Sequence, residues 1–359
     1  MSARVGAPAA AAVRVGRLEL LRRRPLLLGL AGLASVAAVF VAGVGLGHVT
    51  IAPADTLGVI LHRLLGWPAV SWSAATDTIV WELRLPRVVT AMAVGVGLAL
   101  AGATFQGLLR NPLADPYVLG TASGAALGAA IGLIVPVQFA LLGFGLLHVL
   151  AFGGALLAVT VVYRLARVGS LTSMTTVLLT GYAVGAMLAA ALALTMYLSG
   201  SSLRQIFTYL LGSFALSSWP QVAVGLPLIA LGAAVILLRG RVLNALLLGE
   251  ETAAHLGLNV DRERRIMLGA ATLVTAAAVA MSGLIGFVGL VVPQLVRLVV
   301  GPNARVLLPL SAIFGAAFLA LADLLARIPG ELPVGVVTAV VGAPFFLYLL
   351  RRYRAGYAL

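Results

Sequence analysis

Few side chains in this sequence are of a type that could carry out nucleophilic, redox or metal chemistry. The chain has no cysteine, and its 24 basic residues are all arginine. Without cysteine it has no thiol nucleophile or cysteine-bound metal, and without lysine it cannot form the phosphate-binding loop of an ATPase. Its histidines are too widely spaced to suggest a metal cluster; they are His48, His62, His148 and His255. We therefore expect no catalytic residue, no metal and no cofactor bound by this chain.

One acidic residue lies within a long apolar stretch. Asp323 stands near the end of segment 306–326, and Arg327 follows one helical turn later, a spacing that permits an ion pair. A carboxylate at bilayer depth is energetically expensive and often marks an ion-coupled transport site. Of these two interpretations we favour the structural ion pair. No HExxH, GxSxG or paired-carboxylate motif is present, so a membrane enzyme would lack a catalytic cluster.

The overall composition indicates a protein whose solvent is lipid. The 359 residues are 62% hydrophobic and 10% charged, with a mean hydropathy of +1.11, whereas soluble domains carry roughly 25% charged residues. The net charge of +13 is explained by arginines in cytoplasmic loops, so no nucleic-acid partner is expected. The arginine-rich stretch 14–24 precedes an apolar run too long for a cleavable signal peptide.

Ten apolar segments predict membrane crossings, each of which needs about 20 residues. They cover residues 26–47, 87–109, 118–136, 138–163, 173–198, 219–238, 265–285, 286–300, 306–326 and 333–350. An even number of crossings puts both termini on one side. With both in the cytoplasm, 19 of the 24 arginines fall on the cytoplasmic side, as the positive-inside rule requires. The sequence thus predicts an all-α integral membrane protein with ten transmembrane helices.

Three connecting segments have recognisable features. The stretch "FQGLLRNPLADPYVLG" at 105–120 contains Arg110 and two prolines, which predict a tight cytoplasmic turn. Residues 48–86 form the longest outside segment. Residues 239–264 form a long inside segment whose middle predicts a short amphipathic helix. Its apolar positions at helical spacing are Leu246, Leu247, Ala253 and Leu256, with Glu250, Glu251 and His255 between them.

Several long motifs resemble the iron–siderophore, haem and vitamin B12 permeases of type II ABC importers. They are "LRLPRVVTAMAVGVGLALAGATFQGLLRNPLADPYVLGTASGAALGA" at 83–129, "LLLGEETAAHLGL" at 246–258, and a stretch at 286–352 that begins "GFVGLVVPQLVRLVVGPNARVLLP". The resemblance covers nearly all of the chain after the N-terminal tail. It implies one transmembrane permease domain at 26–352, with cytoplasmic tails at 1–25 and 353–359.

The resemblance also implies partners. A permease of this kind forms a homodimer in the bacterial cytoplasmic (inner) membrane, with both termini in the cytoplasm, and binds two ATPase subunits that hold ATP and Mg²⁺. An extracytoplasmic substrate-binding protein delivers the metal chelate, which we expect to be a ferric siderophore first, then vitamin B12 or haem. An ion-gradient-driven secondary transporter is the alternative, and uptake without an ATPase would favour it.

In the family, coupling helices at about 243–258 sit in a cleft of the ATPase. The resemblance therefore implies that the coupling residues are Leu246, Gly249, Glu250, Ala253 and Gly257. A helix lying on the membrane surface is the alternative. The acids on the polar face argue against it, because such helices usually present arginine or lysine to an anionic leaflet.

At the outer rim, the resemblance implies that Arg84, Arg87 and Arg327 dock the binding protein. Their positive charge would steer an acidic partner surface and fix its register. Anchoring at the membrane interface, with the charged groups reaching toward water, is the alternative. Arg327 is a weaker candidate because Asp323 can compete for it.

The uncharged segment 173–198 is implied to line the translocation path with its dimer mate, and ordinary helix packing is the alternative. The candidate path and gate residues are Gln106, Thr172, Ser173, Thr175, Thr176 and Met196. Members of the family often have histidine where this chain has Gln294, directly after Pro293. We draw no substrate inference from that position.

Overall fold

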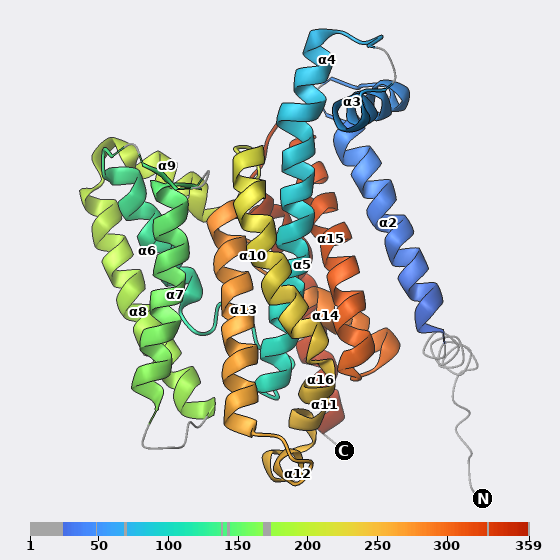
Figure 1. Cartoon of the computed structure of the whole chain (residues 1–359). Helices are drawn as coiled ribbons and strands as arrows, with labels where there is room; N and C mark the ends of the chain where they lie inside the picture. Colours follow the sequence, from blue (N-terminus) through green and yellow to red (C-terminus); the bar gives the residue numbers. More distant parts are fainter. Residues whose placement is uncertain are drawn as a thin grey trace, which may run out of the picture.

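The helices form an elongated bundle in which successive apolar helices run in opposite directions (Figure 1). The computed structural model describes residues 24–47, 49–67, 70–137, 139–141, 144–167, 174–328 and 330–357. Connections alternate between two ends of the bundle. We name these the α12 end, after helix α12 (Glu250–His255), and the α3 end, after helix α3 (Pro53–Leu65). The last helix finishes at the α12 end, where α2 begins.

Ten apolar helices in the described part of the chain coincide with the ten predicted segments, and the all-α membrane fold is confirmed. Eight are long and apolar enough to cross a membrane. They are α2 (Pro25–Gly45), α5 (Leu85–Leu108), α7 (Leu146–Ala166), α8 (Met174–Leu198), α10 (Trp219–Leu238), α13 (Val260–Ser282), α15 (Ala304–Arg327) and α16 (Val334–Tyr357). The two shorter ones are α6 (Thr121–Ile134) and α14 (Val288–Val300).

Helices α6 and α14 are too short to cross a bilayer alone. Their 14 and 13 residues correspond to about 20 Å of helix, against an apolar bilayer core of about 30 Å. Each follows an irregular segment, 109–120 or 283–287. Irregular backbone at membrane depth is tolerated where protein covers it, and these two segments cover each other: the Tyr117 hydroxyl donates to the Ile285 carbonyl at 2.9 Å.

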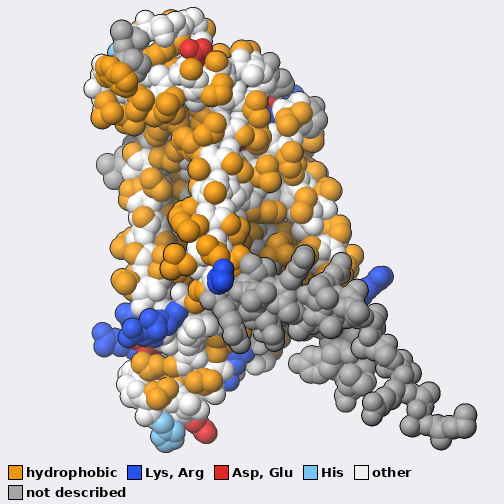
Figure 2. Space-filling view, turned by 90° about the vertical axis from the view of Figure 1, so that its right-hand side faces the viewer, with side chains coloured by type: hydrophobic (Ala, Val, Ile, Leu, Met, Phe, Trp, Pro, Cys, Tyr) orange, Lys and Arg blue, Asp and Glu red, His pale blue; other side chains and the backbone are white. Residues whose placement is uncertain are grey.

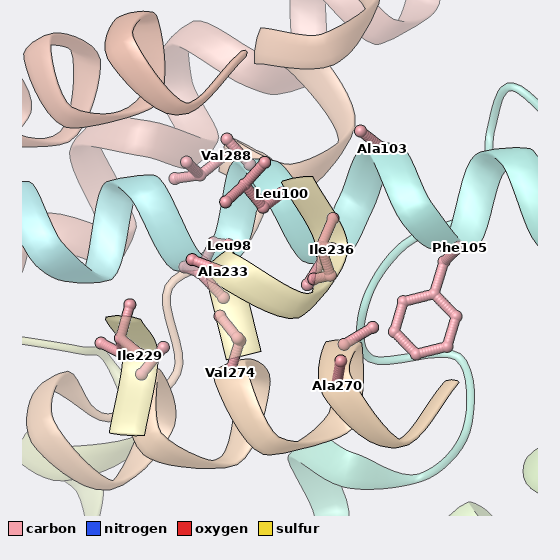
Figure 3. Close-up of a cluster of buried hydrophobic side chains, with 14 of the residues drawn as sticks. Leu98, Leu100, Ala103, Phe105, Ile229, Ala233, Ile236, Ala270, Val274 and Val288 are labelled. Carbon is pink, nitrogen blue, oxygen red and sulfur yellow. The ribbon is translucent and has the colours of Figure 1, made fainter. Parts of the chain in front are cut away.

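Helix α5 is the centre of the bundle, with 83% of its spanning window buried. Its buried side chains Leu98, Leu100 and Phe105 belong to one apolar cluster with residues of α10 and α13, including Ile236 and Val274 (Figure 3). Such mutual burial of side chains from separate helices fixes their relative positions. The helix is therefore the element against which the functional segments are placed.

Glycines permit the closest helix contacts of α5. A Cβ atom on Gly102 would lie 1.9 Å from the Gly289 carbonyl oxygen of α14, and one on Gly95 would lie 2.2 Å from the Gly315 carbonyl oxygen of α15. No side chain fits at such distances. Small residues at helix interfaces are typical of membrane bundles, where close backbone approach supplies the packing energy.

Smaller elements occupy the connections. At the α3 end, helix α4 (Ala74–Thr78) and a π-helical turn η1 (Ile79–Arg84) lead without interruption into α5. Two short strands, β1 (Ala140–Leu141) and β2 (Phe144–Gly145), form an antiparallel pair, and η2 (Gly200–Ser202) precedes α9 (Leu203–Leu210). Helix α11 (Gly240–Leu248) precedes α12.

Three predicted boundaries were wrong. The helical stretch that contains α5 continues back through η1 and α4 to Ala74, within the segment expected to be a long outside connection. Helix α7 starts at Leu146 instead of 138, because the strand pair comes first. Helix α13 starts at Val260 instead of 265, since Asn259 caps it by accepting from the Arg262 amide at 3.0 Å. Hydropathy locates the apolar part of a helix, and polar residues can extend the helix beyond it.

Candidate functional site

The α12 end is the basic end of the molecule. Below the apolar belt, arginine side chains gather on the surface shown in Figure 2, and the same end carries α11 and α12 (Figures 1 and 2). The predicted coupling segment therefore projects beyond the apolar region, where it can contact a partner in water.

The predicted single amphipathic helix is two helices. Gly249 separates α11 from α12 and has φ +128°, a backbone conformation that residues other than glycine rarely adopt. Leu246 and Ala253 are buried against the bundle. Leu256, expected on the same apolar side, is 63% exposed, because the break at Gly249 changes the helical phase. That part of the prediction was wrong.

The outward surface of this pair combines acids with apolar side chains. Glu250, Glu251 and His255 are exposed, and Leu248 and Leu256 are 69% and 63% exposed. Apolar side chains that are exposed together outside the membrane region are suited to an interaction surface. The sequence reasoning did not select Leu248, although its place directly before Gly249 was a signal that it could leave the packed face.

Hydrogen bonds hold the α11–α12 pair to the bundle. Arg110, which follows α5, donates from Nη2 to the Leu246 carbonyl at 2.9 Å. Asn244 donates to the Asn303 side chain at 2.8 Å and accepts from the Ala304 amide at 2.7 Å. The pair is thus fixed to both α5 and α15, so a displacement of its outer surface would be passed to the central helices.

An ion pair fixes α12 to α13. Arg264 donates to the Glu250 carboxylate, and this hydrogen bond lowers the pKa of Glu250. Gly257 follows α12 with φ +81°, and a Cβ atom there would meet no atom within 4 Å. The predicted coupling residues therefore lie together in one compact unit: Leu246, Gly249, Glu250, Ala253 and Gly257.

The stretch 105–120 is a buried joint, in addition to being a turn. Gln106 is buried and donates from Nε2 to the Gly289 carbonyl at 3.1 Å, and Gln294 of α14 donates to the Pro112 carbonyl at 2.5 Å. The residue at 294, which differs from the family's frequent histidine, therefore has a structural partner. These contacts join the end of α5 to α14, and Arg110 in the same stretch reaches α11.

Asp115 lies within this joint. Its carboxylate accepts from the Tyr117 amide at 2.8 Å, a local bond that shapes the turn before α6.

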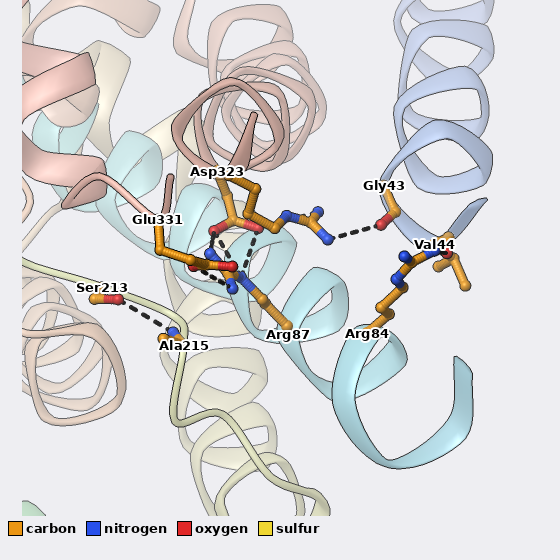
Figure 4. A network of polar contacts seen from close by, with 9 residues as sticks. Gly43, Val44, Arg84, Arg87, Ser213, Ala215, Asp323 and Glu331 are labelled. Atoms are coloured by element: carbon orange, nitrogen blue, oxygen red, sulfur yellow. Dashed lines mark hydrogen bonds and ion pairs between the residues drawn. The ribbon is translucent and has the colours of Figure 1, made fainter. Parts of the chain in front are cut away.

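At the α3 end, three buried arginines make polar contacts that join neighbouring helices, and two of them pair with the buried Asp323 (Figure 4). Asp323, fully buried, pairs with Arg87 at 2.9 Å and with Arg327 at 3.2 Å. Arg87 also pairs with Glu331 at 2.8 Å. Arg84 donates to the carbonyls of Val44 and Gly45 at 2.9 Å each, with no acid as its partner in these bonds. The predicted Asp323–Arg327 ion pair is confirmed.

The three candidate docking arginines are thus turned inward in this conformation. Arg84 and Arg87 are each 8% exposed and Arg327 is 5% exposed. Their partners join α2, α5, α15 and the loop after α15, and Arg327 donates to the Gly43 carbonyl at 3.0 Å. The docking role stays a prediction. The sequence reasoning did not select Glu331, although an acid between Gly330 and Pro333 at the outer end was a visible signal.

The candidate path residues are not brought to one place. Thr175 is exposed and Thr176 half-buried in the first turn of α8, and Met196 is half-buried in its last turn, about 30 Å away along the helix. Gln106 lies in the joint described above. Thr172 and Ser173 fall outside the described residues. Much of α8 is exposed, including Leu179, Tyr182 and Tyr197, so the path assignment stays a prediction.

Known proteins similar to this chain are permeases of transport systems. The FecCD transport family matches residues 34–352. The cobalamin import system permease protein BtuC of Halobacterium salinarum is 46% identical over 298 residues, covering 80% of each chain. The hemin transport system permease protein HmuU of Yersinia pestis is 42% identical over 294 residues, covering 79% of this chain and 87% of the relative.

A further relative and a solved structure agree. The vitamin B12 import system permease protein BtuC of Vibrio cholerae is 43% identical over 308 residues, covering 82% of this chain and 90% of the relative. An inward-facing metal-chelate type ABC transporter superposes with a TM-score of 0.78 at 28% identity, covering 91% of this chain and 99% of that one. The chain therefore belongs to the FecCD transport family and has the fold of a type II ABC importer permease.

Proposed function

We propose that this chain is the membrane-spanning subunit of an importer for a bulky metal chelate in the bacterial inner membrane. Two copies form the transport path, two ATPase subunits bind at the α12 end, and a substrate-binding protein docks at the α3 end. The chain itself binds no cofactor, and ATP with Mg²⁺ is held by the ATPase. Its movement between outward-open and inward-open forms is driven by the ATPase.

The exposed surface of α11–α12 carries the proposal. It presents Leu248 and Leu256 beside Glu250 and Glu251, outside the apolar belt. An apolar centre with charged neighbours is suited to a protein partner, and the Arg110–Leu246 bond ties it to the central helix. A secondary carrier has no need of such a rigidly attached surface.

The orientation follows from charge. Arginine accumulates on the cytoplasmic side of membrane proteins, and arginines gather at the α12 end. We therefore place that end, with both termini, in the cytoplasm. The α3 end then faces the binding protein, and docking there by Arg84, Arg87 and Arg327 would require the network around Asp323 to open.

The substrate class rests on the relatives, which are named for cobalamin or hemin. We propose a metal chelate and would test cobalamin and haem alongside the ferric siderophores that the sequence motifs put first. Helix α8, without charge and largely exposed, would face the path with its dimer mate. An uncharged lining suits a bulky cargo that must be released.

Reconstituted transport tests the proposal. Proteoliposomes containing the permease and its ATPase, with the binding protein added on the side of the α3 end, should transport a chelate only when ATP is present on the side of the α12 end. Vesicles with the permease alone should show no uptake under an imposed proton or sodium gradient. Gradient-driven uptake without the ATPase would favour the secondary carrier.

A further inference from the structure

A groove of about 320 Å³ lies between α7 and α13, which run side by side in Figure 1. Its lining runs from Leu156 to Arg164 on α7 and from Arg265 to Thr272 on α13, mostly at every third or fourth position. Residues at that spacing lie on one face of a helix. Two facing helix surfaces therefore build the groove, over about 10–12 Å of each helix.

Two arginines line the groove at the α12 end. Arg164 is in the last turn of α7 and Arg265 in the second turn of α13, and both are exposed. Neither forms an ion pair with any residue that the structure describes. Of the nearby acids, Glu263 pairs with Arg239, and Asp261 accepts from Arg265 through its backbone carbonyl at 3.3 Å. The positive charge in the groove is therefore not neutralised by a carboxylate of the described lining.

An unpaired hydroxyl lies farther along the groove. Thr272 is 3% exposed and its Oγ1 has no hydrogen-bond partner, although most buried hydroxyls have one. It follows Arg265 by two helical turns, about 10 Å toward the middle of α13. The Thr160 hydroxyl, in contrast, donates to the Leu156 carbonyl at 2.7 Å. With apolar side chains such as Leu268 around it, the Thr272 hydroxyl is a donor left for an occupant of the groove.

We propose that this groove binds an anionic phospholipid of the leaflet at the α12 end. The phosphate lies against Arg164 and Arg265, whose guanidinium groups match phosphate geometry. An ester carbonyl of the lipid accepts from Thr272, and an acyl chain covers Leu268. Half-buried Tyr163 in the same lining is of a residue type that gathers at headgroup level.

The depth of the groove favours a lipid over an acidic protein segment. Its lining continues about 10 Å past the arginines between two helices long and apolar enough to cross a membrane, within the roughly 15 Å of apolar core that belongs to one leaflet. Basic pockets between membrane helices on the cytoplasmic side are suited to anionic headgroups. The inference does not depend on the transported substrate.

Native mass spectrometry of the purified permease tests the headgroup site. With phosphatidylglycerol and phosphatidylcholine of equal chain length, the wild type should retain phosphatidylglycerol about tenfold more tightly, as expected for two arginines near an anionic group. Arg164→Gln with Arg265→Gln should abolish this preference. The control is Arg241→Gln with Arg305→Gln, which removes two exposed arginines from α11 and α15 and should leave the preference intact. Equal loss in both double variants, or no preference in the wild type, would overturn the proposal.

Filling the groove tests the acyl chain. Gly269 lines it, and a Cβ atom there would meet no atom within 4 Å, so a larger side chain can enter without moving the helices. Gly269→Leu should weaken retention of both lipids several-fold. Gly153→Leu on α7 is the control, since that position is equally open but does not line the groove. Unchanged retention in Gly269→Leu, or equal loss in both variants, would contradict an acyl chain in the groove.

Two measurements on the wild type test the site should a variant fail to fold. Photoactivatable phosphatidylglycerol in vesicles should label peptides from α7 and α13, and labelling confined to other helices would contradict the site. Bound phosphatidylglycerol should persist when inorganic phosphate or the purified ATPase is added. Displacement by phosphate would assign the arginines to a free anion, displacement by the ATPase would assign them to that partner, and either result would overturn the lipid site.

Discussion

Asp323 and Arg327, one turn apart on α15, form an ion pair at 3.2 Å whose carboxylate is shared with Arg87 of α5 at 2.9 Å. The carboxylate is fully buried, and both arginines are nearly so. A buried pair that loses one partner leaves an uncompensated charge, which destabilises by about 3–5 kcal/mol. The network therefore holds α2, α5 and α15 together at the α3 end.

Replacing Asp323 tests this arrangement. Asp323→Asn should lower the free energy of unfolding by about 3–5 kcal/mol, measured by denaturation in detergent. The matched control is Asp77→Asn, since Asp77 pairs with Arg63 at a more exposed site, where the arginine is 44% exposed. That change should lower the unfolding free energy by no more than about 1 kcal/mol. Similar small losses in both variants would show that the buried network is not a structural centre.

A second prediction concerns the contact between α5 and α14. Gly102→Ala should disrupt folding, because its Cβ would lie 1.9 Å from the rigid Gly289 carbonyl oxygen. Overpacking of this kind destabilises by about 1–3 kcal/mol or more. Gly269→Ala on α13 is the control, since no atom lies within 4 Å of its Cβ. Thermal unfolding, monitored by size-exclusion chromatography, should give a lower melting temperature for Gly102→Ala than for Gly269→Ala. Equal melting temperatures would argue against the close contact.

A third prediction concerns the outer surface of α11–α12. Leu248→Ser with Leu256→Ser should weaken binding of the ATPase about tenfold or more, as expected for apolar anchors of an interface. Leu216→Ser removes a side chain that is 87% exposed near the opposite end and should leave binding unchanged. Surface plasmon resonance with the purified ATPase distinguishes these outcomes, and equal affinities for all three proteins would exclude this surface.

Much of the fold was predictable because each helix has an apolar stretch of its own. The irregular joint was not, since the link from Gln294 to Pro112 connects positions 182 residues apart. The same limit applies at the α3 end. The sequence pairs Asp323 with Arg327 by local spacing, but Arg87 and Glu331 join the network only through tertiary contacts.

The predicted coupling segment, α11 with α12, shows a different limit. Its acids and glycines were recognisable from the motif, but a single helical period predicted that Leu246 and Leu256 share a face. The positive φ of Gly249, which breaks the helix, separates them. Local conformation, which the pattern of apolar residues does not specify, decided which leucine is available to a partner.

Cross-linking to the ATPase tests the central claim most directly, because the chain has no cysteine or lysine of its own. Leu256→Cys and Leu216→Cys would each be assembled with the ATPase in membranes and treated with a reagent joining cysteine to lysine. The account predicts a permease–ATPase product at position 256 that is absent at position 216. A product at 216 and none at 256, in assemblies that retain ATP-driven uptake, would contradict it.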